Sequence, residues 1–176
     1  MKKSLSLWQL GGLTFTAVLG TLLHFLYEWT GLIALAPFCA VNESTWEHMK
    51  ILFFPMLFFS FVQSLFFKKD YPNFWWVKLV GMITGTLLIP VLFYTINGAF
   101  GKTPDWVNIT IFFLSAGCAY LIEGIIFQKQ GKPYKAAFIA VILLLLIALT
   151  FVFFTFAPPK IPLFQDPLTS KYGIIA

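Results

Sequence analysis

Five long apolar stretches constrain this chain of 176 residues more than any other feature. Each has the roughly 20 residues that a helix needs to cross about 30 Å of hydrocarbon. Hydrophobic residues make up 59% of the chain and charged residues only 11%, which is far from the balance of a soluble domain. We therefore predict an all-α integral membrane protein, a bundle of five transmembrane helices at about 8–27, 46–67, 74–96, 106–127 and 136–156.

The five spans are expected to form one domain, residues 1–156, followed by an extended extracytoplasmic tail, residues 157–176. Prolines in the tail exclude a sixth helix, because proline removes a backbone donor and clashes with the preceding turn. Asn97 and Gly98 favour a helix stop after the third span. Residues 29–41 are apolar but too short to span, so they are either an outer loop packed on the bundle or a re-entrant element.

The lysines predict the orientation of the bundle, since positively charged loops stay on the cytoplasmic side. The chain has twelve basic residues, and all of them are lysines. The N-terminus is therefore predicted to be cytoplasmic and the tail to lie outside. The larger group, on the predicted inner side, is Lys2, Lys3, Lys68, Lys69, Lys78, Lys129, Lys132 and Lys135; the smaller, outer group is Lys50, Lys102, Lys160 and Lys171.

The lysine clusters are too short to follow a phosphate backbone, so nucleic acid is not an expected partner. Membrane lipids are, and a small-molecule or lipid ligand fits the same picture; no protein partner is indicated. The bias toward Lys, Phe and Ile suggests an AT-rich bacterial genome, and hence a multipass protein of the bacterial cytoplasmic membrane.

Acidic residues and both histidines gather at the predicted outer side. His24 and Glu28 are four residues apart on the first helix, so their side chains share one face. An ionisable residue inside a span costs roughly 2.5–3.5 kcal/mol and is a functional hypothesis by default. The alternative is a satisfied polar contact near the lipid headgroups.

The second helix begins in the segment NESTWEHMK, residues 42–50. Ser44 and Glu47 match a capping box, in which Ser44 caps the helix and Glu47 reaches back to a free amide. This leaves Glu43 and His48 without a structural role. Glu43 and Glu47 also repel each other at this spacing unless a cation or a proton lies between them.

These residues predict a site for a divalent metal ion, with Zn²⁺ favoured because it binds imidazole and carboxylate ligands. Adjacent Glu47 and His48 diverge by about 100° on a helix, which weighs against both facing one centre. Asp166, on a tail that folds back as a lid or stays loosely ordered, and Asn97 are candidates to join the cluster. The expected metal ligands are His24, Glu28, Glu43 and His48, the expected catalytic residues are Glu43, Glu47 and His48, and other polar site residues are Asn42, Asn97 and Asp166.

A metal-dependent intramembrane hydrolase or lipid-modifying enzyme is the leading functional hypothesis, because a metal activates water and a remaining glutamate acts as general base. One alternative is a binding or transport subunit that recognises a polar or cationic solute at the outer face. Another is a structural or regulatory membrane partner, in which the polar cluster only caps and holds helices.

Other features are expected to be structural. Gly81 and Gly85 form a GxxxG face for close helix packing, and Pro55 and Pro90 are expected to kink their helices. Glu123 is expected near the cytoplasmic end of its span, where its carboxylate reaches water.

Several segments together resemble a family of small bacterial multipass membrane proteins of unknown function. The shared segments are HFLYEWTG from His24, NESTWEHMK from Asn42, FFP at 53–55, and the tail pattern IPLFQDP followed by YG. The resemblance extends over nearly the whole chain. It implies a location for the site but no reaction or ligand.

Overall fold

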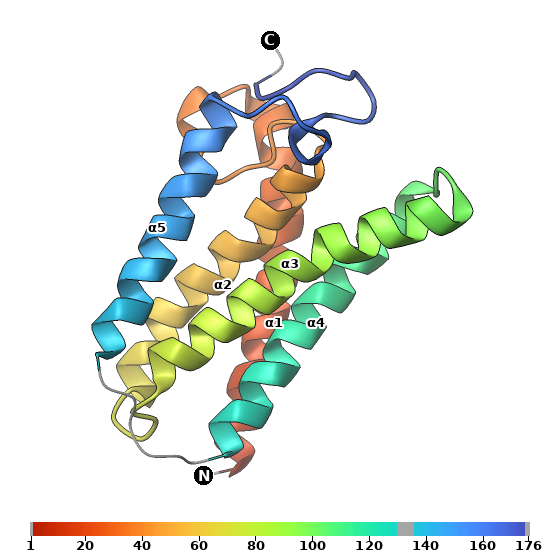
Figure 1. Ribbon diagram of the computed structural model, residues 1–176. Coiled ribbons are helices and arrows are strands. Elements are labelled where there is room, and N and C mark those ends of the chain that lie inside the picture. Colours follow the sequence, from red (N-terminus) through yellow and green to blue (C-terminus); the bar gives the residue numbers. More distant parts are fainter. Residues whose placement is uncertain (1, 130–135, 175–176) are drawn as a thin grey trace.

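Five long helices form a bundle in the computed structural model, which describes residues 2–129 and 136–174 (Figure 1). All five are long and apolar enough to cross a membrane, which confirms the predicted fold class. The predicted loop residues Lys132 and Lys135 lie outside the described part of the chain. The helices are α1 Lys2–Thr30, α2 Thr45–Phe67, α3 Phe74–Phe100, α4 Asp105–Gln128 and α5 Ala137–Phe156.

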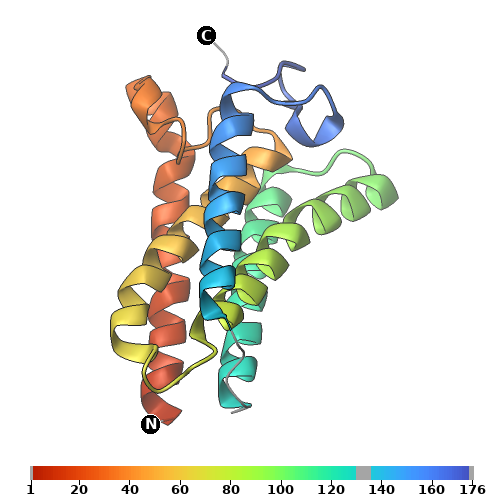
Figure 2. The ribbon, with the colours of Figure 1, turned by 60° about the vertical axis from the view of Figure 1, so that its left-hand side comes forward.

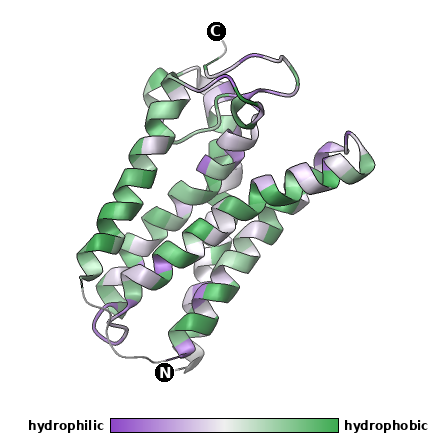
Figure 3. Cartoon of the chain, viewed as in Figure 1, coloured by the Kyte–Doolittle hydropathy of each residue, from purple (hydrophilic) through white to green (hydrophobic). Residues whose placement is uncertain are grey.

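Helix α2 lies at the centre of the bundle and contacts α1, α3 and α5, while α4 packs against α1 and α3 (Figure 2). Apolar residues predominate along the helices, as the hydropathy colouring shows (Figure 3). We call the end where α1 finishes, α2 begins and the C-terminal tail lies the tail end (Figure 1). At this end the α3–α4 hairpin diverges from the other helices.

Two helices are longer than predicted. Helix α1 starts at Lys2 and runs to Thr30, beyond the expected 8–27. Helix α3 continues through Asn97 and Gly98 to Phe100, so the predicted stop after Ile96 is wrong. The reason is that the Asn97 side chain caps from within the last turn: its Oδ1 accepts hydrogen bonds from the backbone and side chain of Thr103.

The segment between α1 and α2 is a packed loop. After Thr30 it forms a short 3₁₀ helix, Ile33–Leu35, and then returns beside the last two turns of α1, where the N–H of Ala40 donates to the carbonyl of Leu23 at 3.1 Å. Ala36 and Cys39 are fully buried in this loop. Burial raises the pKa of the Cys39 thiol.

The tail folds back onto the bundle. Phe164 is buried and its ring lies 4.6 Å from the Trp46 ring, centroid to centroid. The amide of Asn42 donates to the carbonyl of Gly173 at 2.7 Å, which joins the tail to the start of α2. The tail is thus an ordered cover on the tail end.

A polar network lies inside the bundle toward its other end. Lys78 on α3 pairs with Glu123 on α4, with 2.5 Å between Nζ and Oε2, and both side chains are almost fully buried. The prediction that Glu123 reaches water is therefore wrong. Gln9 on α1 donates to both the Glu123 carboxylate and the Tyr120 carbonyl.

Close helix packing makes room for this pair, as the GxxxG pattern predicts. A Cβ on Gly81 would lie 2.5 Å from Oε1 of Glu123, and one on Gly85 would lie 2.9 Å from Cβ of Ala119. Small residues therefore let α3 approach α4 closely. Lys78 and Lys50 are both buried in ion pairs instead of lying at a membrane surface. The remaining lysines keep the same bias, and the orientation stays a prediction.

Candidate metal centre

Three of the predicted ligands converge at the tail end: His24 from α1, Glu43 from the loop before α2, and His48 from the first turn of α2. One ligand atom from each lies within 4.8 Å of the other two. The imidazole Nε2 of His24 is 3.8 Å from Oε1 of Glu43, and Nε2 of His48 is 3.7 Å from Oε2. We call these three residues the His/Glu/His triad. Its carboxylate bridges two imidazoles.

Local structure at the start of α2 positions two members of the triad. The Ser44 hydroxyl accepts a hydrogen bond from the N–H of Glu47, which confirms the predicted cap. The Asn42 side chain accepts from the N–H of Ser44 at 2.8 Å, which turns the chain sharply before the helix. Glu43 lies between these two residues, so the turn that begins the helix also fixes the backbone that carries its carboxylate.

A hydrogen bond sets the tautomer of His48. Its Nδ1 lies 3.0 Å from the carbonyl oxygen of Ser44. A carbonyl only accepts, so Nδ1 carries the proton and, in the neutral ring, Nε2 presents a lone pair toward Glu43. This is the arrangement by which proteins orient a metal-binding imidazole, with the second nitrogen held by a backbone carbonyl.

The triad brings lone pairs together without a hydrogen bond between them. The Nε2 lone pair of His48 faces a carboxylate oxygen at 3.7 Å, beyond hydrogen-bond distance. A cation between them removes the repulsion. Ligands on a tetrahedral Zn²⁺ at about 2.0–2.2 Å lie about 3.3–3.6 Å from each other, so the three ligand atoms, which lie within 4.8 Å of one another, would need to draw together by up to about 1.5 Å.

Glu47 points away from the triad. Its carboxylate pairs with Lys50, with 2.5 Å between Oε2 and Nζ, and accepts the N–H of Val41 at 3.1 Å. The predicted reach of Glu47 back to the helix cap is therefore wrong; the carboxylate binds the loop one turn earlier. Lys50 also donates to the Ala36 carbonyl and the Thr155 hydroxyl, so all three of its protons have partners.

The other predicted site residues lie apart from the triad. Glu28 is exposed one turn beyond His24 and is not part of the group. Asn97 binds the α3–α4 turn, and Asp166 accepts hydrogen bonds from Leu168 and Thr169 within its own tail. Asn42 is the exception, since it shapes the loop that carries Glu43.

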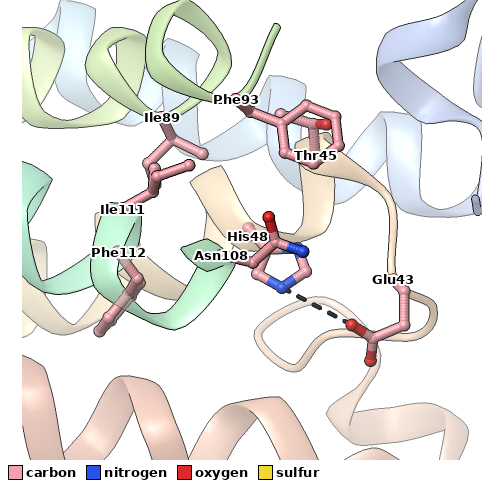
Figure 4. Close-up of a pocket in the computed structure, with 8 residues that line it drawn as sticks. All are labelled: Glu43, Thr45, His48, Ile89, Phe93, Asn108, Ile111 and Phe112. Carbon is pink, nitrogen blue, oxygen red and sulfur yellow. Dashed lines mark ion pairs between the residues drawn. The ribbon is translucent and has the colours of Figure 1, made fainter. Parts of the chain in front are cut away.

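A pocket adjoins the triad on the side of α3 and α4 (Figure 4). Sequence reasoning missed the contribution of α4. Asn108 reaches this pocket, and its buried Oδ1 has no hydrogen-bond partner. A lone amide near the start of an apolar span was the available signal. The pocket is lined by Glu43, Thr45, His48, Ile89, Phe93, Asn108, Ile111 and Phe112.

The five apolar helices and the triad define a multipass membrane protein with a group of side chains able to hold a metal ion. Residues 1–174 match the model of a family of unknown function, DUF6512, and the chain belongs to that family. No curated protein and no solved structure matches the chain.

Proposed function

We propose that the His/Glu/His triad binds a divalent metal ion, Zn²⁺ above others, and that the protein is a metal-dependent membrane hydrolase or lipid-modifying enzyme. The observation that carries the proposal is the convergence of two imidazoles and one carboxylate, with the His48 tautomer already set by Ser44. Two histidines and a glutamate are one of the ligand sets of catalytic zinc, which keeps a fourth position open.

The pocket beside Glu43 and His48 is where a substrate would meet that open position. A Zn²⁺ held by the triad would lower the pKa of a water molecule to about 7 and so make it the nucleophile. In hydrolysis the water oxygen bonds to the acyl carbon or phosphorus, the bond to the alkoxy oxygen breaks, and the departing alkoxide takes a proton from the water. The chain contributes the triad, which would hold the metal, and Asn108, which would orient the substrate.

Glu47, one of the predicted catalytic residues, is better suited to positioning. Its pairing with Lys50 and with the N–H of Val41 occupies the carboxylate. Because Val41 is two residues before Glu43, this contact helps to fix the loop of the triad. Glu43 and His48 therefore remain the candidates that would touch metal or substrate.

Metal analysis of the purified protein tests the proposal. We expect about one Zn²⁺ per chain, because the described residues contain one such three-ligand group. Changing His24, Glu43 or His48 to alanine should weaken zinc affinity by more than about 100-fold. Losing a residue that only orients a metal ligand costs at most about 100-fold, and these three would be ligands themselves. Glu28→Ala is the matched control, an exposed acid at the same end, and should keep the metal. A metal-free protein, or equal zinc in all variants, contradicts the proposal.

The leading alternative, a binding or transport subunit for a cationic solute, uses the same carboxylate, since the Glu43 side chain is 42% exposed. It predicts a solute that raises the melting temperature of metal-free protein without being turned over. A purely structural or regulatory role predicts that triad variants unfold before any binding is lost.

We also propose that the protein lies in the bacterial cytoplasmic membrane with the N-terminus inside, so that the triad faces outward. The lysine bias supports this orientation. Alkaline phosphatase fused after residue 174 should be active, since that enzyme folds only outside the cytoplasm. Fluorescence from a C-terminal fusion to a fluorescent protein that folds only in the cytoplasm would argue for the reverse orientation.

A further inference from the structure

The hollow beside the triad has the size of one water molecule. It offers about 20 Å³ of space for the centre of a water molecule. A buried water needs about 10–15 Å³ by the same measure. Three apolar side chains with at most 7% exposure close the hollow on the side of α3 and α4, namely Ile89, Ile111 and Phe112. The hollow therefore fits a guest as small as water.

Close packing against α1 holds one of these walls in place. A Cβ on Gly20 would lie 2.6 Å from Cζ of Phe112 and 3.0 Å from the carbonyl oxygen of Ile51. The absence of a side chain at Gly20 thus lets the Phe112 ring lie directly against the backbone of α1. A ring held in this way leaves the hollow little room to expand.

The polar side of the hollow has acceptors that lack donors. Oδ1 of Asn108 is buried and has no hydrogen-bond partner. The Nε2 lone pair of His48 faces the Glu43 carboxylate at 3.7 Å, and neither of these two groups donates to the other. A buried acceptor without a donor is destabilising. The hollow therefore favours a guest that donates hydrogen bonds in more than one direction.

Water meets this requirement, because it has two protons to donate and an oxygen that accepts. One proton would go to Oδ1 of Asn108 and the other to Glu43 or to Nε2 of His48, since all three residues line the hollow (Figure 4). Buried waters typically make about three hydrogen bonds to polar groups that otherwise lack partners. The Thr45 hydroxyl, which also lines the hollow, can donate the third.

We infer that the hollow binds one water molecule and that Asn108 is the residue that positions this water beside the triad. Any part that the water takes in a reaction rests on the proposed function. With a metal ion on the triad, the water oxygen would fill the open fourth position while Oδ1 of Asn108 accepts a hydrogen bond from it. The NH₂ group of the same amide is the part that would orient a substrate. The water site itself needs no metal.

A crystal structure of the full-length protein, treated with a chelator and solved at a resolution that shows ordered water, tests this inference directly. We expect density for one water molecule in the hollow, about 2.7–3.0 Å from Oδ1 of Asn108. The same density is expected after the crystals are soaked with zinc. A hollow without water, or an Asn108 amide that bonds to a protein group instead, overturns the inference.

Variants of Asn108 test its positioning role in solution. Asn108→Leu keeps roughly the size of the side chain and removes the acceptor, so zinc affinity should fall about tenfold, as for the loss of other supporting residues. Asn108→Asp keeps an acceptor oxygen and should recover most of the affinity. Thr110→Val removes a hydroxyl from the exposed side of the same helix and should leave the affinity unchanged. Competition with a chromophoric chelator measures all three.

Equal zinc affinity in Asn108→Leu and the wild-type protein contradicts the positioning role, and so does a loss in Asn108→Leu that Asn108→Asp does not reverse. If Asn108→Leu fails to fold, the density in crystals of the wild-type protein decides alone.

The outcomes also separate this inference from the proposed function. A water on Asn108 in a protein that binds no zinc would contradict the metal proposal and support the water site. Stoichiometric zinc beside a hollow without water would do the opposite.

Discussion

Glu43 and Glu47 lie four residues apart in one short segment, yet their carboxylates have opposite surroundings. The Glu47 carboxylate is 2% exposed and closed by Lys50 at 2.5 Å and by the N–H of Val41. The Glu43 carboxylate is 42% exposed and faces two imidazoles at 3.7–3.8 Å. One glutamate has its charge satisfied within the protein, and the other has ligand atoms to offer. We regard the first as part of the fold and the second as part of a site.

The Glu123 carboxylate, deep in the bundle, is a second closed carboxylate, by which we mean one that is buried and paired with a lysine. Four aromatic rings surround the Lys78 ammonium at 5.3–6.0 Å from their centroids. Cation–π contacts of this kind add to the stabilisation of a desolvated ammonium. Each of the two buried lysines is therefore paired with a buried carboxylate, Lys78 across two helices and Lys50 within α2, which makes the open arrangement of the triad a departure from the pattern.

The largest effect is expected from Lys50→Met. The change leaves the Glu47 carboxylate buried and without a counter-ion, which costs about 3–5 kcal/mol. Unfolding by SDS in mixed detergent micelles measures the free energy of unfolding. Lys102→Met, at an exposed position between α3 and α4, should change it little. A loss below about 1 kcal/mol would mean that Glu47 is not a closed carboxylate, as surface pairs contribute no more than that.

Zinc should stabilise the wild-type protein next most strongly. At a free concentration 100 times the dissociation constant, binding to the folded state alone adds about 2.7 kcal/mol. The melting temperature in detergent, with and without zinc, measures this gain. Glu43→Ala should show none of it, while Glu47→Gln should still respond to zinc, though from a lower starting stability. A zinc-dependent gain in stability in Glu43→Ala equal to that of the wild-type protein would show that the ion binds elsewhere.

Asn42→Ala should have a smaller effect on stability, about 1 kcal/mol, because it removes one hydrogen bond to Ser44 and one to Gly173. The loop that carries Glu43 then becomes less well fixed, so zinc affinity should fall about tenfold, as for the loss of other supporting residues. Competition with a chromophoric chelator measures that affinity. Asn42→Asp is the partial rescue, since a carboxylate also accepts from the N–H of Ser44. An unchanged zinc affinity in Asn42→Ala would show that the tail contact does not influence the zinc site.

The smallest effect is expected from Glu43→Gln in metal-free protein. Its partly exposed side chain makes no hydrogen bond within 3.5 Å to either histidine, so stability should change by less than about 0.5 kcal/mol. The free energy of unfolding in the presence of a chelator measures this. A loss of about 2 kcal/mol or more would show that Glu43 is a structural residue like Glu47, and the contrast between them would fail.

Hydropathy alone predicts the five helices, and the cap at Ser44 predicts the start of α2 within a residue. Glu43 and His48 were identifiable because a capping box leaves them without a role. The pairing of Glu47 with Lys50 could not be identified from the sequence. The two residues are three apart on a helix, and which face of that helix is buried depends on the packing of α5 and of the loop between α1 and α2. The position of Asn97 likewise depends on Thr103, after the turn. Membership of a family of unknown function carries no chemistry, so the reaction could not be predicted from it.

The contact between Asn42 and Gly173 links residues 131 positions apart in the chain. During synthesis, four further helices must be made after α1 before the carbonyl of Gly173 exists to accept that hydrogen bond. The loop of Glu43 therefore reaches its final form late, after α5 has been inserted and the tail has folded back. An incompletely translated chain would carry His24, Glu43 and His48 but would lack this contact between their loop and the tail.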